Sequence, residues 1–452
     1  MIFSASRFVV VDDKEIHLRA ITDTFQRLGT PCIGIRYEPA EELNPDHFRS
    51  VRCLFVDLHL VDGQASTDER RHYALIASIL EDNINRNGGP FILVLWTAHE
   101  HLSAELRDYL DQHIDANKPY ARPLAVLSLA KERFVDVNSG SVNNPEELRQ
   151  AIEQAIISNS QLAALLGWES DVLAAAGDTL ASLLNLVPAE QRTSVAFPAA
   201  LNTILSRLAR ETVGRSHVDV DPRTAISMAL APILSDRILN QDVAETTQGI
   251  WKAAVTRYND RQLEAAPPLM AGEINRMLHL AVPGSETFLP ADWGAVVTWP
   301  FPWADDELKR LTGLTIKQML CEEFRLRSHA IEVCKPVLIR VGAACDYAQN
   351  NRGPIMFLFG LDIPEDAERQ KDSNERPIKL TDAIWKSPIF LMPGAAEATR
   401  LHAHIRFPQI YLPEACSQWT VYCRLREQLL MHLISTASNH VARPGIVQLP
   451  VD

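Results

Sequence analysis

The sequence predicts an α/β domain at the N-terminus, followed by a helical middle region and a mixed α+β region. Over residues 7–159, short apolar runs alternate with segments whose apolar residues recur at helical spacing. Because the apolar runs are continuous, we expect strands that are buried on both faces. Strands of this kind, alternating with helices, predict a parallel sheet with helices on both sides.

Five successive units of strand and helix account for this region. The expected strands are residues 7–14, 32–37, 52–60, 91–98 and 123–131. The expected helices are residues 16–29, a polar segment after residue 37, and residues 66–85, 103–114 and 144–156. Local signals support several ends, since Gly29 suits a helix stop, Asn144 suits an N-cap and residues 87–90 predict a turn.

Polar side chains stand at the carboxyl ends of four of these strands. Asp12 and Asp13 end the first strand, and Asp57 lies near the end of the third. Thr97 follows the fourth, and Lys131 closes the fifth. In a parallel sheet these ends share the edge where ligands bind. Close carboxylates repel one another unless a cation such as Mg²⁺ lies among them, and a lysine and a hydroxyl beside them fit phosphoryl transfer.

This combination resembles the receiver domain of bacterial two-component response regulators. The resemblance covers residues 7–159 and rests on VVDD (10–13), LFVDLHLVDG (54–63), LWTA (95–98) and LSLAK (127–131). It implies a flavodoxin-like (βα)5 fold. It also implies that Asp57 accepts a phosphoryl group from a sensor histidine kinase. Asp12, Asp13 and Asp57 would bind Mg²⁺, with the backbone carbonyl of His59 as a further ligand.

The sequence departs from the usual receiver pattern near the residues that normally transmit phosphorylation. The resemblance implies that Thr97 is the switch hydroxyl and that Lys131 is the phosphate-binding lysine. Ser128 stands three residues before this lysine, where an aromatic residue is usual, and Glu132 follows it in place of proline. The segment after Asp57 is short and lacks the common proline. We therefore expect Asp57 to accept a phosphoryl group, and the structural response to phosphorylation stays open.

Two further domains are expected, a helical one over residues 160–285 and a mixed α+β one over residues 286–452. Helical spacing occurs over residues 162–187, 197–214 and 224–239. The expected C-terminal strands are residues 333–349, 354–364, 384–392 and 398–408, followed by a terminal helix over residues 417–445. Pro232 predicts a kink or break within the third helical segment.

Two pairs of residues in the C-terminal region are candidate reactive groups. Cys345 and Asp346 follow an apolar strand and would combine a nucleophile with a helper, although no base partner is identified by spacing. His402 and His404 alternate on one strand face and would ligate a metal together with a cysteine. For both pairs, a packed or solvated structural role is the simpler interpretation.

Composition limits the classes of function. The net charge of -13 and the lack of a basic recognition helix argue against nucleic-acid binding. No apolar run approaches the ~18–20 residues that span a bilayer, and the early acid pair argues against a signal peptide. The 7 cysteines are scattered, as expected of reduced thiols in a cytoplasmic protein.

The leading hypothesis is a phosphoacceptor protein of a bacterial phosphorelay. The chain is similar to the accessory receiver proteins of Detocs-type antiphage systems, which implies a phosphate sink or partner-binding regulator. A sensor histidine kinase and a second receiver-containing effector protein are the implied partners, and a homodimer stays open. The alternative is a phosphorylation-regulated effector enzyme whose active site lies in the C-terminal domain. A DNA-binding regulator is less favoured.

Overall fold

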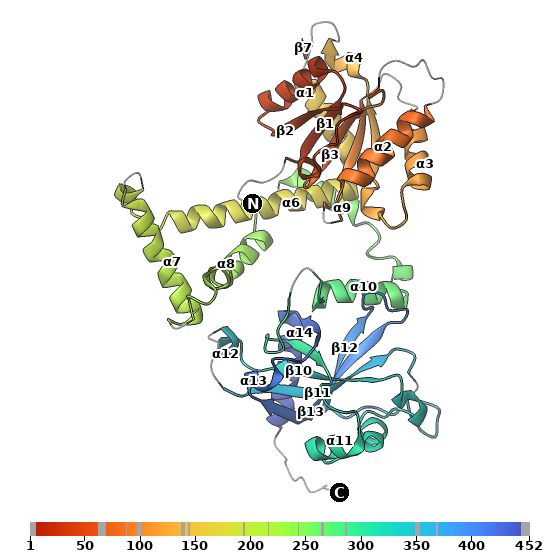
Figure 1. Ribbon diagram of the computed structural model, residues 1–452, viewed down its shortest axis with the longest axis vertical. Coiled ribbons are helices and arrows are strands. Elements are labelled where there is room, and N and C mark those ends of the chain that lie inside the picture. Colours follow the sequence, from red (N-terminus) through yellow and green to blue (C-terminus); the bar gives the residue numbers. More distant parts are fainter. Residues whose placement is uncertain are drawn as a thin grey trace. The chain divides into compact units, whose positions relative to one another are not determined.

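A five-stranded parallel sheet forms the N-terminal part of the protein, as seen in a computed structural model (Figure 1). Its strands are β1 (Phe8–Asp12), β2 (Cys32–Arg36), β3 (Cys53–Asp57), β4 (Ile92–Trp96) and β5 (Ala125–Leu129). Their order is β2-β1-β3-β4-β5, which is a flavodoxin-like pattern. All five lie within the predicted strands, and the α/β prediction for this region is confirmed.

The structure describes most of the chain, with short gaps. The described residues are 6–61, 69–86, 88–96, 102–136, 141–142, 145–192, 195–215, 217–242, 244–263, 266–284, 287–348, 353–367 and 369–443.

Helices cover both faces of the parallel sheet (Figure 1). They are α1 (Glu15–Arg27), α2 (Arg70–Asn83), α3 (Leu102–His113), the short α4 (Lys131–Phe134) and α5 (Pro145–Ile157). Val9 and Val11 of β1 pack in the core under α2 and α3, whereas Val10 packs in the core under α1 and α5. Successive strand residues therefore face opposite helical layers, which explains why the strands are apolar throughout.

The connection between β2 and β3 is less helical than the sequence predicts. Only one 3₁₀ turn, Pro45–Phe48, forms in the polar segment, with the Asn44 side chain accepting a hydrogen bond from the Asp46 amide at 3.0 Å. After β5, a small two-stranded sheet pairs β6 (Val135–Asp136) with β7 (Ser141–Val142).

The middle of the chain is helical, as predicted. Its helices are α6 (Ser160–Leu184), α7 (Phe197–Val213), α8 (Pro222–Leu239), α9 (Glu245–Ala254) and α10 (Pro268–His279). Pro232 lies inside α8, which continues through it, so no break occurs there. None of the helices in the described ranges combines the length and apolar character needed to cross a membrane.

A seven-stranded sheet dominates the C-terminal region. Its strands are β8 (Leu280–Ala281), β9 (Ala295–Thr298), β10 (Lys335–Val341), β11 (Ile355–Pro364), β12 (Ile384–Phe390), β13 (Thr399–Tyr411) and β14 (Val421–Leu425). The order is β12-β13-β11-β10-β9-β14-β8, with antiparallel pairing throughout. The accompanying helices are α11 (Asp305–Thr312), a π-helical turn Gln318–Glu323, α12 (Ala344–Ala348), α13 (Pro413–Cys416) and α14 (Glu427–Val441).

Two details of this sheet concern its close packing at Gly360 and the edge formed by β12. A Cβ added to Gly360 of β11 would lie 2.5 Å from the carbonyl oxygen of His402 on the neighbouring strand β13. β12, which lies at one end of the described sheet, shifts its register against β13 between Lys386 and Ile389, and Pro388 lies within the shift.

Two sequence predictions for this region are wrong. The strand expected over residues 333–349 ends at Val341, because Gly342 adopts a φ of 137° that an extended strand does not allow, and Cys345 lies in the short helix α12. The terminal helix expected over residues 417–445 is strand β14 followed by α14. Residues 421–425 alternate about the sheet, with Cys423 and Leu425 buried, so their period is two and not 3.6.

The chain divides into two structural units. One comprises Met1–Val172 with Asp242–Thr256, and the other comprises Leu173–Gln241 with Arg257–Asp452. In the first unit, Arg52 at the start of β3 makes a two-pronged ion pair with Glu169 of α6, at 2.8 and 2.9 Å. The division into domains at residues 159 and 285 stays a prediction.

Candidate functional site

Asp12 and Asp57 lie side by side at the carboxyl edge of the parallel sheet. They end β1 and β3, which pair in parallel up to Val11 and Val56, so the two acids occupy the next positions in register. The Asp12 side chain is fully buried and Asp57 is half-buried. Carboxylate oxygens of both residues and a ring nitrogen of His17 all lie within 4.8 Å of one another.

The start of α1 holds Asp12 in place. The backbone amide of Lys14 donates a hydrogen bond to Asp12 Oδ1 at 2.9 Å. The N-terminus of a helix carries a partial positive charge, which favours a carboxylate at this position. His17, in the first turn of α1, is buried and places Nδ1 3.5 Å from Asp12 Oδ1. The strand-to-helix turn therefore orients both an acid and an imidazole toward Asp57.

Asp13 completes the acidic group. Burial raises the pKa of its carboxyl above the ordinary value, and the charges of Asp12 and Asp57 raise this pKa further, against the opposing effect of Lys14. Its Oδ1 atom is buried and accepts no hydrogen bond from the described residues. A buried oxygen of this kind beside two further carboxylates fits a bound cation, which would relieve the repulsion. The group could therefore bind a metal ion.

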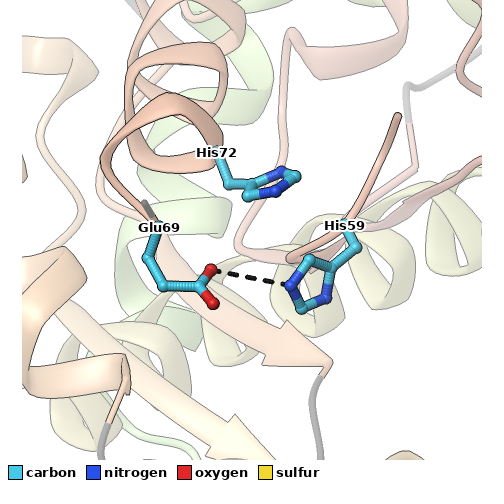
Figure 2. Close-up of side chains that lie close together, drawn as sticks. All are labelled: His59, Glu69 and His72. Atoms are coloured by element: carbon cyan, nitrogen blue, oxygen red, sulfur yellow. Dashed lines mark ion pairs between the residues drawn. The ribbon is translucent and has the colours of Figure 1, made fainter. Parts of the chain in front are cut away.

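Beyond Asp57, the chain turns so that His59 faces α2. The His59 amide donates a hydrogen bond to Asp57 Oδ1 at 3.3 Å. Its imidazole lies beside Glu69 and His72, and Figure 2 shows the three side chains converging. His59 Nε2 is 3.5 Å from Glu69 Oε2, and the His59 and His72 ring centres are 4.7 Å apart. Burial and the nearby His59 lower the pKa of His72.

The structure brings together only part of the predicted site. Asp12, Asp13 and Asp57 interact electrostatically at the carboxyl edge of the sheet, and the His59 amide contacts Asp57. Thr97 lies outside the described residues. The predicted strand 123–131 ends at Leu129, and Lys131 opens α4 with its side chain outside the described part of the chain. The roles predicted for Thr97 and Lys131 are therefore untested.

Sequence reasoning missed His17, Glu69 and His72. The signal for His17 is its place in the first turn of the helix that follows the acid pair, where a side chain points back toward the strand end. Glu69 and His72 stand three residues apart at the start of α2, a spacing that places both on one helix face. His59 comes from a different segment, so its approach to them depends on the tertiary fold.

The C-terminal histidines are held by charged neighbours. His402 and His404 are both fully buried on β13. His404 Nε2 lies 2.9 Å from the Glu323 carboxylate, and His402 Nε2 lies 3.0 Å from the Arg369 guanidinium. Burial, with the Arg369 charge second, lowers the pKa of His402 to about 3. Within the described ranges, neither histidine belongs to a three-residue group that could hold a metal.

The Cys345 and Asp346 pair lies on the protein surface. Cys345 is exposed on the short helix α12, and its Sγ lies 3.9 Å from Asp346 Oδ1. Apart from this carboxylate, no ring nitrogen or other base is shown in contact with this thiol among the described residues. This arrangement gives no support to a nucleophilic role.

Comparison of the chain with protein-family models, with curated proteins and with solved structures finds no match.

Proposed function

We propose that the N-terminal unit is a receiver domain with a flavodoxin-like (βα)5 fold, and that Asp57 accepts a phosphoryl group. The observation that carries the proposal is the meeting of Asp12 and Asp57 at the carboxyl edge of adjacent parallel strands, with Asp13 beside them. Ligands bind at this edge in open α/β sheets. Of the three acids, Asp57 combines a strand-end position with partial exposure, which a nucleophile needs to reach a donor.

The chemistry follows from the placement of the side chains. A carboxylate oxygen of Asp57 attacks the phosphorus of a phosphorylated histidine on a sensor kinase. The new P–O bond forms as the P–N bond breaks, and the histidine nitrogen leaves. The His59 amide, 3.3 Å from Asp57 Oδ1, orients the carboxylate. Asp12 and Asp13, with Asp57 and the His59 carbonyl, would hold Mg²⁺, which would neutralise the acids and the incoming phosphoryl oxygens.

Storage of phosphate is the output that we propose. Ser128 in β5 stands where the resemblance leads us to expect a switch aromatic, and we propose that the usual coupling to an output surface is not used. A protein that accepts phosphate without this coupling would serve as a phosphate sink or bind a partner. The partners would be a sensor histidine kinase and a receiver-containing effector of an antiphage phosphorelay.

Phosphoryl transfer from a small donor tests this function. The purified full chain is incubated with radiolabelled acetyl phosphate and Mg²⁺, and the label is measured after gel separation. We expect one label per chain that hydroxylamine removes, as it removes acyl phosphates. Asp57→Asn should abolish labelling, and Asp13→Asn should reduce it strongly.

The matched control is Asp111→Asn, which changes an exposed acid on α3 and should label like the wild type. Absence of label from both acetyl phosphate and a cognate kinase would refute the proposal. Label that persists in Asp57→Asn would assign acceptance to another residue.

A further inference from the structure

We propose that His59, Glu69 and His72 form a second metal site, which takes one transition-metal dication of the Zn²⁺ type. His59 follows β3, Glu69 immediately precedes α2, and His72 lies in the first turn of α2. One ligand atom from each of the three residues lies within 4.8 Å of the other two. In Figure 2 the two imidazoles and the carboxylate converge on a common space.

The distance between His59 and Glu69 fits two ligands of one ion. Zn²⁺ binds nitrogen and oxygen ligands at ~2.0–2.1 Å in tetrahedral geometry, which sets neighbouring ligand atoms roughly 3.3–3.4 Å apart. His59 Nε2 and Glu69 Oε2 are 3.5 Å apart. This separation is longer than a good N–H···O hydrogen bond, which measures ~2.7–3.2 Å. The pair is therefore spaced for an ion between its members.

Glu69 supplies a second, independent observation. Its Oε2 atom is buried from solvent and accepts no hydrogen bond from the described residues. A buried carboxylate oxygen without a hydrogen bond is unfavourable, because it loses its water contacts and gains no donor. An ion bound by Oε2 would replace that lost interaction. The ion pair of the partly exposed His59 and Glu69 side chains would by itself contribute little.

The donor set selects the class of ion. Two imidazoles and one carboxylate suit Zn²⁺ and related transition metals, whereas Mg²⁺ prefers oxygen ligands and keeps its waters. Three protein ligands leave the fourth position of a tetrahedral ion for water. The side-chain ligands of this site differ from those of the acidic group, which uses only the backbone of His59, so the site does not depend on whether Asp57 accepts phosphate.

Calorimetric titration of the full chain with Zn²⁺ tests the proposal. The titration is made after removal of metal with a chelator, in a Cys345→Ser background so that the exposed thiol does not compete. We expect one equivalent of Zn²⁺ that His72→Gln and Glu69→Gln each weaken by on the order of 100-fold or more, beyond the ~10–100-fold that an outer-shell partner contributes. Co²⁺ in place of Zn²⁺ should give the visible absorption of a tetrahedral site in the Cys345→Ser chain and lose it in His72→Gln.

The controls separate this site from others. His113→Gln changes an exposed histidine that stacks on Tyr109, and it should leave the titration unchanged. Asp13→Asn impairs the acidic group and should also leave Zn²⁺ affinity unchanged, so failure of the proposed phosphoryl acceptance is distinguished from failure of this site. Equal Zn²⁺ affinity in the His72→Gln and unaltered chains, or no binding to either, would overturn the proposal.

Discussion

The buried His402 side chain of β13 stays neutral over the physiological pH range. Its ring is fully buried, and its nearest charged neighbour is the Arg369 guanidinium, 3.0 Å from Nε2. Burial and that positive charge both disfavour an imidazolium, so the pKa falls from 6.5 to about 3. A neutral ring nitrogen can accept a hydrogen bond from the guanidinium, whereas an imidazolium cannot.

This low pKa predicts acid sensitivity of the C-terminal unit. In the unfolded chain, His402 binds a proton as the pH falls below 6.5. In the folded chain, it binds this proton only when the pH falls to about 3. Between these two pH values the unfolded state binds more protons than the folded state. This group therefore lowers the free energy of unfolding by about 1.4 kcal/mol for each unit by which the pH is decreased. His402→Gln should remove that slope between pH 6 and 4. Urea unfolding at a series of pH values measures it.

The slope, and not the absolute stability, is the informative quantity, because His402→Gln also changes packing. His113→Gln serves as the control, since His113 is exposed and should leave the slope between pH 6 and 4 unchanged. An unchanged slope in His402→Gln would contradict the prediction.

Single residues of the candidate site were predictable only where the strand pattern positions them. Asp12 and Asp57 follow apolar runs, so their meeting at one sheet edge follows from the parallel arrangement alone. The approach of His59 to Glu69 and His72 depends on how the chain returns to α2, and no local spacing encodes that path. The burial of His402 and His404 required knowledge of both layers that cover β13, whereas alternation along the strand showed only that they share a face.

At the scale of elements, the close pairing of β11 with β13 depends on a glycine. Gly360 lies at a register irregularity between the two strands, and a Cβ there would also lie 3.3 Å from Val337 Cγ2 of β10. The nearest atom, the His402 carbonyl oxygen at 2.5 Å, belongs to backbone and cannot rotate away. A side chain at this position would push the central strands of the sheet apart.

Gly360→Ala should therefore lower the free energy of unfolding by about 1–3 kcal/mol or more, as overpacking of a well-packed core does. The control is Gly177→Ala in α6, an exposed helical glycine whose added Cβ meets nothing within 4 Å. That change should raise stability by about 0.5–1 kcal/mol through helix propensity. Chemical denaturation of both variants measures whether the free energy of unfolding changes in opposite directions. Equal changes would argue against a close approach of β11 and β13 at Gly360.

Elements with one clear period were predicted well, and those with competing periods were not. The strands of the parallel sheet are continuous apolar runs between turn signals, and the observed strands fall inside the predicted ranges. Residues 417–445 contain apolar side chains that fit a helix if read as one segment. Burial of Cys423 and Leu425 by pairing with β9 and β8 decides in favour of a strand, and that pairing is not visible in local sequence.

At the scale of the whole molecule, each of the two structural units has its own hydrophobic core. The parallel sheet of the first unit buries its core residues under α1, α2, α3 and α5. In the second unit, Leu429, Leu430 and Leu433 of α14 pack with the antiparallel sheet. Separate cores allow separate cooperative unfolding transitions.

We expect differential scanning calorimetry of the full chain to resolve two transitions. Gly360→Ala should lower the midpoint of one transition and leave the other within error, because the substitution alters only the core of the second unit. A uniform shift of both transitions, or a single transition whose calorimetric and van't Hoff enthalpies agree, would show that the two cores unfold together.

The register shift and proline of β12 bear on how the protein behaves when it is concentrated. An outermost strand exposes amide and carbonyl groups that can template pairing with another chain, the first step of many aggregates. Pro388 offers no N–H, and the shift between Lys386 and Ile389 interrupts the regular ladder. β12 therefore lacks the continuous row of donors and acceptors that a strand of a second molecule would need. At that margin, the folded antiparallel sheet is in this way protected from growing into intermolecular β-structure.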